Sequence, residues 1–279
     1  MAHRLGTCLV VLAALAVVSA ASAAFPGPYG LQGGQGVLSI DRSVSFTATK
    51  NAGGTLIQAV STEGGSVLRT RALDGQYGIP TIQYNRPGDG MSRDGKTFVV
   101  ENVGFADTSR FMLLSTSDLS TVDSFTLNGT YAFDALSPTG SMMYLIQHKT
   151  TQDINHYIVR GYDLRSHTLL PQRIADKTQK DWVMQGWAVT RATSPSGRWV
   201  YTLYTNPGGY PFVHALDTVK GVAHCVGLPW PATDSQQNAV WNFTLRLKGN
   251  TLAVRYQGGS IYRYINTTNW KVSKKPIAR

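Results

Sequence analysis

The sequence has almost no cysteine. Its 279 residues include two, Cys8 and Cys225, and Cys8 lies in a segment that we expect to be removed. The single cysteine that remains excludes an intramolecular disulfide. Stability must therefore come from a hydrophobic core, and a chain of this length is sufficient to bury one.

Acidic residues are also scarce. The chain has 16 Asp and Glu against 26 Lys and Arg, and only two of the acids are glutamates, Glu63 and Glu101. The net charge is +10 and becomes +9 without Arg4. Such a field attracts anionic neighbours such as cell-envelope polymers, lipid headgroups or nucleic acid. Nucleic-acid binding would require a continuous basic face, and only the net charge supports it. We therefore expect no specific nucleic-acid partner.

A long apolar run occurs only at the N-terminus. Arg4 precedes an apolar stretch from Cys8 to Val18, and small residues follow at 21–24. This order is typical of a secretory signal peptide over residues 1–24, cleaved near Ala23 or Ala24. The stretch is too short for a membrane span, and no later segment is long enough. We expect residues 25–279 to form one domain that is secreted, extracellular or periplasmic, and monomeric.

The rest of the chain lacks helical periodicity. Short runs rich in Val, Thr, Tyr, Phe and Ile alternate with Gly, Pro, Asn and Asp, which predicts an all-β protein. Three segments repeat one pattern of strand, Ser-x-x-Gly turn and strand, at 91–100, 136–145 and 193–202. Weaker copies at 50–57 and 246–253 keep the glycine. The turn glycines are Gly54, Gly95, Gly140, Gly197 and Gly249.

A second feature follows each glycine, where a strand ends in an Asp or Asn that begins another turn. These residues are Asp74, Asp118, Asp163, Asp217 and Asn266. Asp and Asn side chains hydrogen-bond the backbone two residues on, so we interpret the row as turn formers and not as a site. Four strands per repeat of about 40 to 50 residues predict a β-propeller of about five four-stranded blades, or six.

The turns Ser137-Pro-Thr-Gly140 and Ser194-Pro-Ser-Gly197, each followed by a strand and later by a strand ending in Asp, resemble the secreted bacterial YVTN and WD40-like propeller repeats. The resemblance covers most of residues 37–275. It implies membership in an uncharacterised family of secreted bacterial propellers. The resemblance concerns the architecture and does not indicate an activity.

Candidate ligand-binding residues lie on the innermost strands, which line the central channel of a propeller. Three residues before the turn serine stand Asp89, Asp134 and Arg191, with Ala48 and Phe243 at the corresponding places in the weak copies. An arginine between carboxylates forms strong bidentate hydrogen bonds. Such a group either staples neighbouring blades, the role we favour, or holds a polar ligand.

A secreted glycan-acting hydrolase is the alternative, since such enzymes use paired carboxylates. It requires at least two of Asp89, Asp134, Glu101 and Asp181 to share one pocket. No Gly-x-Ser-x-Gly motif, His-x-His or His-x₃-His pair or phosphate-binding glycine loop is present, so we assign no catalytic residue, metal or cofactor.

All six tryptophans lie in the last hundred residues. Most are expected in the core, but Trp182 and Tyr210 lie in expected loops and can form a stacking surface. We therefore expect a non-catalytic binding or scaffold propeller. A loop rim at 177–187 and 205–212 would engage a protein or an anionic cell-envelope polymer.

Overall fold

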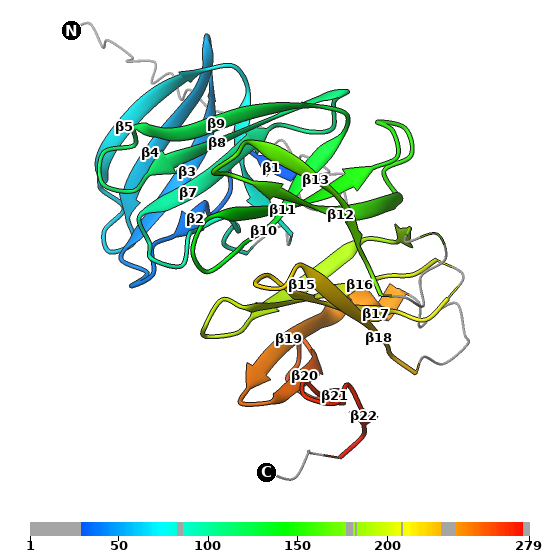
Figure 1. The fold of residues 1–279 in the computed structure, drawn as a ribbon. Coiled ribbons are helices and arrows are strands. Elements are labelled where there is room, and N and C mark those ends of the chain that lie inside the picture. The colour runs from blue at the N-terminus through cyan, green and yellow to red at the C-terminus, as the bar shows by residue number, and fades with distance from the viewer. Residues whose placement is uncertain are drawn as a thin grey trace, which may run out of the picture.

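The computed structural model describes residues 29–82, 86–176, 181, 183–207, 209–229 and 238–275. Its strands form five antiparallel sheets arranged around an axis, which we call blades 1 to 5 (Figure 1). The prediction of an all-β fold with about five blades is confirmed. Among the described residues no helix is long and apolar enough to cross a membrane.

Blades 1 and 2 are built from the N-terminal part. Blade 1 contains β2 (Val37–Leu38), β3 (Val44–Asn51), β4 (Gly54–Ser61) and β5 (Val67–Asp74). Blade 2 contains β6 (Tyr77–Thr81), β7 (Thr97–Asn102), β8 (Thr108–Ser115) and β9 (Thr121–Asn128), with β1 (Tyr29–Leu31) added beside β6.

Blades 3, 4 and 5 follow in chain order. Blade 3 contains β10 (Tyr131–Leu136), β11 (Met142–His148), β12 (His156–Asp163), β13 (Thr168–Ile174) and the short β14 (Met184–Gln185). Blade 4 contains β15 (Ala188–Thr193), β16 (Trp199–Tyr204), β17 (Phe212–Asp217) and β18 (Val222–Gly227). A 3₁₀ turn (Asn238–Asn242) leads into blade 5, which contains β19 (Phe243–Lys248), β20 (Thr251–Tyr256), β21 (Ile261–Asn266) and β22 (Val272–Ser273).

The repeated serine turns connect the two inner strands of blades 2, 3 and 4. In each, the glycine N–H donates to the serine carbonyl, at 2.8 to 3.0 Å, and the serine Oγ accepts from the N–H five residues on, at 2.9 to 3.0 Å. The glycines have φ between 67° and 75°, a region that other residues rarely adopt. The Ser-x-x-Gly motif therefore forms one hydrogen-bonded corner three times.

The weak copy at 50–57 was assigned to the wrong hairpin. Gly54 lies in the β3–β4 hairpin, whereas the inner turn of blade 1 is Ser39 to Arg42, where the Val44 N–H donates to Ser39 Oγ at 3.0 Å. Arg42 occupies the glycine position with φ 63°. Asp74 consequently ends the outermost strand instead of starting its turn, and Ala48 lies in the buried core of β3.

Aromatic pairs link consecutive blades. The ring centroids of Phe46 and Phe98 are 4.6 Å apart between blades 1 and 2, and those of Phe125 and Tyr162 are 3.9 Å apart between blades 2 and 3. The corresponding pairs are Tyr157–Tyr204 at 5.6 Å and Trp199–Trp270 at 5.3 Å. Each pair lies in or beside an apolar cluster that joins two blades.

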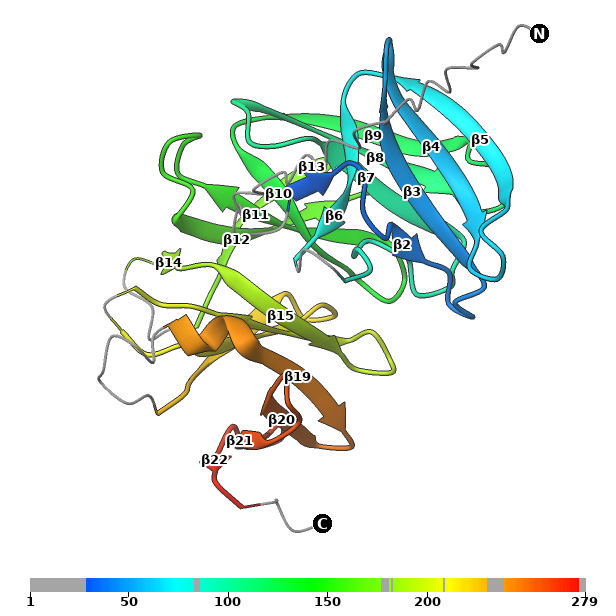
Figure 2. The ribbon, with the colours of Figure 1, turned by 180° about the vertical axis from the view of Figure 1, so that it is seen from behind.

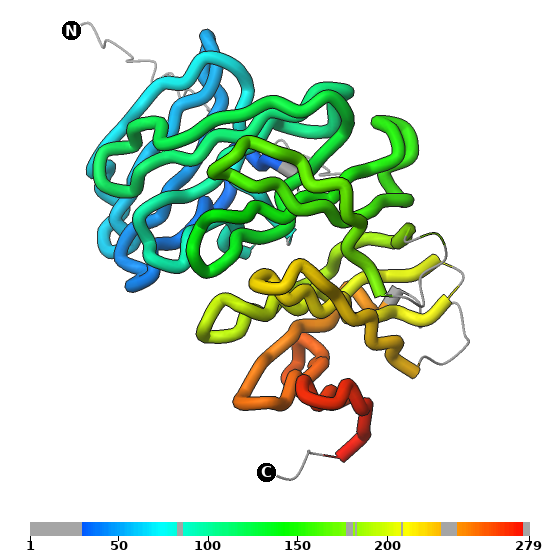
Figure 3. The backbone as a smooth tube through the Cα atoms, in the orientation of Figure 1, coloured from blue at the N-terminus to red at the C-terminus, as the bar shows by residue number. Residues whose placement is uncertain are grey.

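The ring of blades is open. Among the described residues no apolar cluster, hydrogen bond or ion pair joins blade 5 to blade 1. Figures 1 and 2 show the two blades at opposite ends of an arc, and the tube of Figure 3 traces this arc from blue to red. The described residues therefore form four blade interfaces for five blades.

Candidate functional site

Arg191 joins blade 4 to blade 3 beside the axis. Its Nη2 donates to Asp134 Oδ1 and its Nη1 donates to the Asp134 main-chain oxygen. Its Nε donates to Thr202 Oγ1 at 3.0 Å. The Asp134 side chain is 1% exposed and the Arg191 side chain 8%. A buried pair with one hydrogen bond to the carboxylate and one to the main chain fixes the relative position of two inner strands.

A β-bulge places the Asp134 side chain. In the β10–β11 ladder Phe133 pairs with Leu145 and Ala135 pairs with Tyr144, so Asp134 is the extra residue. A bulge re-aims one side chain without ending the sheet.

Asp89 completes the group from blade 2. Its Oδ1 lies 3.7 Å from Arg191 Nη1, and its side chain is 28% exposed. Its N–H donates to the Pro80 carbonyl at 2.7 Å, which holds the segment between β6 and β7 against the axis. Burial raises the pKa of Asp89, the Arg191 charge lowers it, and Asp134 raises it further. The structure thus brings Asp89, Asp134 and Arg191 together.

Glu101 lies behind this group in β7. Its side chain is buried, and its Oε2 accepts from the Phe133 N–H at 2.7 Å. Burial raises the pKa of Glu101 to about 8, and the nearby Asp89 adds to the rise. At neutral pH this carboxyl is held mainly in its neutral form.

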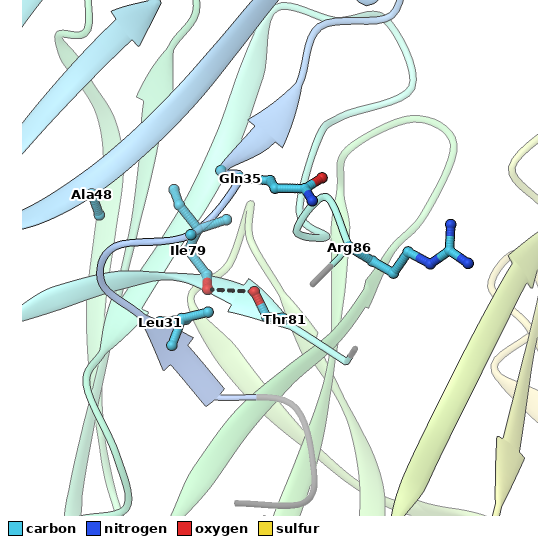
Figure 4. Close-up of a pocket in the computed structure, with 8 residues that line it drawn as sticks. Leu31, Gln35, Ala48, Ile79, Thr81 and Arg86 are labelled. Carbon is cyan, nitrogen blue, oxygen red and sulfur yellow. Dashed lines mark hydrogen bonds between the residues drawn. The ribbon is translucent and has the colours of Figure 1, made fainter. Parts of the chain in front are cut away.

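Three cavities follow one another near the axis. The first, about 250 Å³, is lined by Asp89, Asp134 and Arg191. The second, about 400 Å³, shares Asp89 and Arg191 and adds Arg86, Arg246 and Arg255. The third, about 120 Å³, lies between β1, β3 and β6 and shares Arg86. In Figure 4 the Arg86 guanidinium points away from Leu31 and Ile79.

The second cavity is strongly basic. Of its four arginines only Arg191 has an ion pair among the described residues. Arg255 donates to the Gly259 carbonyl at 3.0 Å from Nη2, and its charge is not neutralised by that contact. Among the described residues of the lining, Asp89 is the single carboxylate. The sequence interpretation missed Arg86, Arg246 and Arg255, because nothing in a lone arginine of a strand or loop indicates that it faces a shared cavity.

The remaining candidates lie elsewhere. Tyr210 precedes β17 and is 60% exposed, and Trp182 lies outside the described residues. Asp181 does not line any of the three cavities; its carbonyl accepts from Arg173 Nη1 at 3.1 Å. Within the described ranges no group of three His, Cys, Asp or Glu side chains is arranged to hold a metal ion.

No protein-family model matches the sequence, and no curated protein matches it. Among solved structures, the chain is similar to Kuenenia stuttgartiensis hydrazine synthase, with a TM-score of 0.51, 14% identity and coverage of 84% of this chain and 71% of that one.

Two further structures match at lower TM-scores. The β-propeller domain of Swd1 (Cps50) from Myceliophteria thermophila has a TM-score of 0.49 and 12% identity, over 91% of this chain and 73% of that one. A putative TolB from Agrobacterium tumefaciens has a TM-score of 0.45 and 15% identity, over 89% of this chain and 79% of that one. At such identities a likeness concerns the fold alone. The five antiparallel sheets around one axis make this chain a β-propeller.

Proposed function

We propose that this protein is a secreted, non-catalytic binding or scaffold propeller that engages a protein or an anionic cell-envelope polymer. The observation that carries the proposal is the excess of arginine in the cavity of about 400 Å³. Guanidinium groups match carboxylate and phosphate oxygens with two parallel hydrogen bonds. Arg86, Arg246 and Arg255 have no carboxylate partner in the described part of the chain, so an anionic group that enters there gains three cationic contacts.

The geometry supports a binding role over the hydrolase alternative. Asp89 and Asp134 do line one cavity, which the hydrolase requires. However, the Asp134 carboxylate is buried against Arg191 and the Glu101 carboxyl is buried against the Phe133 N–H. Of these three acids only Asp89 has a partly exposed carboxylate, and the fourth candidate, Asp181, does not line this cavity. Glycoside hydrolysis needs two carboxyl groups that reach the same sugar.

The test compares two double variants of equal charge. Arg246→Gln with Arg255→Gln removes two cavity cations. Arg165→Gln with Lys220→Gln removes two exposed cations at outer turns. Binding of poly-L-glutamate and of inorganic polyphosphate to residues 25–279 is measured by fluorescence anisotropy at two salt concentrations.

We expect at least one anionic probe to bind, and the cavity variant to weaken it about tenfold or more while the control changes it less than about twofold. Equal losses in the two variants would mean that net charge alone attracts the probes. Hydrolysis of glycan substrates that disappears in Asp89→Asn would replace the binding proposal with the hydrolase.

A separate experiment tests whether the protein is exported. The full chain expressed in a bacterial host is fractionated, and the released protein is sequenced from its N-terminus. A start at Ala24 or Phe25 in the medium or periplasm is the expected result, and full-length protein retained in the cytoplasm contradicts it.

A further inference from the structure

The open side of the arc carries two sheet faces that no blade covers. Central strands in the middle of the arc are buried on both faces: all six residues of β17 are buried, as are five of six in β16 and four of six in β7. The strands β3, β4, β19 and β20 instead alternate between buried and more exposed residues. Alternation is typical of a sheet with one covered face.

The uncovered face of blade 5 is basic. Phe243, Leu245 and Val254 point toward blade 4, so the residues between them point to the open side. Arg246 pairs across the strands with Ala253, and Thr244 pairs with Arg255. Both arginines therefore lie on this face, and both line the basic cavity of about 400 Å³.

The uncovered face of blade 1 has one charged side chain among the described strand residues, the carboxylate of Asp74 at the end of β5, which pairs with Gly54. Phe46, Ala48 and Ile57 pack toward blade 2, which leaves the alternate residues on the open side. These are Ser45, Thr47, Thr49, Leu56, Gln58 and Val60. On the neighbouring β5, Val67 pairs with Val60 and is 53% exposed. Apart from that one carboxylate, this face offers apolar, amide and hydroxyl groups and no cation among the described strand residues.

We propose that an acidic protein segment docks in the open side between blade 5 and blade 1 as an extended strand. Alternate residues of a strand point to opposite faces, so acidic residues reach Arg246 and Arg255 while the apolar residues between them cover Leu56 and Val60. This rests on the proposed binding function and names its partner.

Two other occupants fit the two faces less well. A phosphate polymer satisfies the arginines but has no apolar group to bury on blade 1. A second copy of this chain places the basic face of one protomer against the blade 1 face of the other, which offers Arg246 and Arg255 only the carboxylate of Asp74 at the end of β5. Charge complementarity on one side and apolar cover on the other together favour an acidic protein segment.

The experiment uses two peptides of the same composition. One alternates glutamate and valine over eight residues, and the other has four glutamates followed by four valines. Both are titrated into residues 25–279 by anisotropy, and hydrogen exchange of β3, β4, β19 and β20 is measured with each peptide and with polyphosphate. Light scattering over a range of concentrations reports self-association.

We expect the alternating peptide to bind about tenfold or more tightly than the block peptide and to slow exchange in β3 or β4 as well as β19 or β20. Arg246→Gln with Arg255→Gln should abolish this preference. Gln58→Glu, which adds a negative charge of similar size to the blade 1 face, should weaken the alternating peptide severalfold, and Gln58→Asn should not.

Several results would overturn the docking proposal. Equal binding of the two peptides, or polyphosphate binding without slowed exchange in blade 1, removes the protein segment but leaves an anion-binding propeller. Concentration-dependent dimers that protect the same strands assign the faces to a second copy. If neither peptide nor any polyanion binds, the proposed function fails as well.

Discussion

Blades 2 to 4 bury both faces of their central strands, whereas the two end blades bury only one. The middle blades lie between two neighbours, so their central strands bury both faces and read as nearly continuous apolar runs, such as 142–146 and 199–204. Blades 1 and 5 have one neighbour each, and their strands alternate. Position in the arc, and not the repeat motif, decides how much of a strand is core.

The same contrast separates structural from exposed arginines. Arg191, between blades 3 and 4, is bonded to Asp134 and Thr202. Arg246, on the uncovered face of blade 5, has no ion pair among the described residues and is exposed. One side chain fixes the scaffold and the other remains available to a ligand.

The largest expected effect comes from breaking the buried pair. Arg191→Met leaves the Asp134 carboxylate buried without its partner and should lower the free energy of unfolding by about 3–5 kcal/mol. Arg246→Met should change it by less than about 0.5 kcal/mol. Urea denaturation followed by tryptophan fluorescence measures both. Adding Asp134→Asn to Arg191→Met should recover part of the loss, and similar small effects of both arginine variants would remove the stapling role.

The next largest loss of stability is expected from a substitution in the core of a middle blade. Leu203 is fully buried between blades 4 and 5, and Leu203→Ala should cost about 2–4 kcal/mol through lost transfer energy and a cavity. Leu56→Ala on the uncovered face of blade 1 should cost less than about 1 kcal/mol. Equal losses in the two variants would show that the blade 1 face is covered in solution, which thermal and urea unfolding can both reveal.

The pH dependence of stability tests the buried carboxyl of blade 2. The pKa of Glu101 is about 8 in the folded chain against an ordinary value of 4.5, so the folded chain binds the extra proton between these values. The stabilising contribution of the protonated group is complete below pH 4.5 and is lost as the pH rises through 8, with a slope of up to about 1.4 kcal/mol per unit.

Unfolding of the wild type and of Glu101→Gln between pH 5 and 9 should show this slope only in the wild type. The matched variant is Glu63→Gln, which removes an exposed carboxyl from a turn of blade 1. A slope that persists in Glu101→Gln would assign it to another group.

The smallest change in stability is expected when an exposed apolar side chain of blade 1 is replaced. Leu68→Ser removes a side chain that is 48% exposed and should change stability by less than about 0.5 kcal/mol. Solubility at high concentration should rise, because an uncovered apolar strand promotes association. A loss of more than about 2 kcal/mol would indicate that this strand is packed.

Sequence patterns predicted the blades well where their turns carry the full motif. Ser-x-x-Gly fixes a corner through two local hydrogen bonds, so it could be recognised in blades 2, 3 and 4 without any tertiary information. Blade 1 was assigned one hairpin too late because Arg42 adopts the left-handed conformation that glycine usually supplies. A pattern based on glycine cannot find a turn that lacks it.

The candidate site was predictable in part for a related reason. Counting back from the turn serine placed Asp89, Asp134 and Arg191 on inner segments, and these segments converge at the axis of any propeller. The bulge at Asp134 and the burial of Glu101 depend on ladder register and on neighbouring blades. The basic cavity draws residues from blades 2, 4 and 5, which no local pattern connects.

The sequence by itself determined the all-β class, the serine turns and the approximate number of blades, because these follow from local hydrogen bonds and alternation along each strand. It also determined the turns at Asp118, Asp163 and Asp217, where each carboxylate accepts from the N–H two residues on. The tertiary structure alone decided that the ring is open, that Arg191 is neutralised by Asp134 while Arg246 and Arg255 are not, and that two sheet faces lack a neighbour. Those features depend on the angle at which successive blades pack and on which side chains meet across them, and that information is distributed over the whole chain.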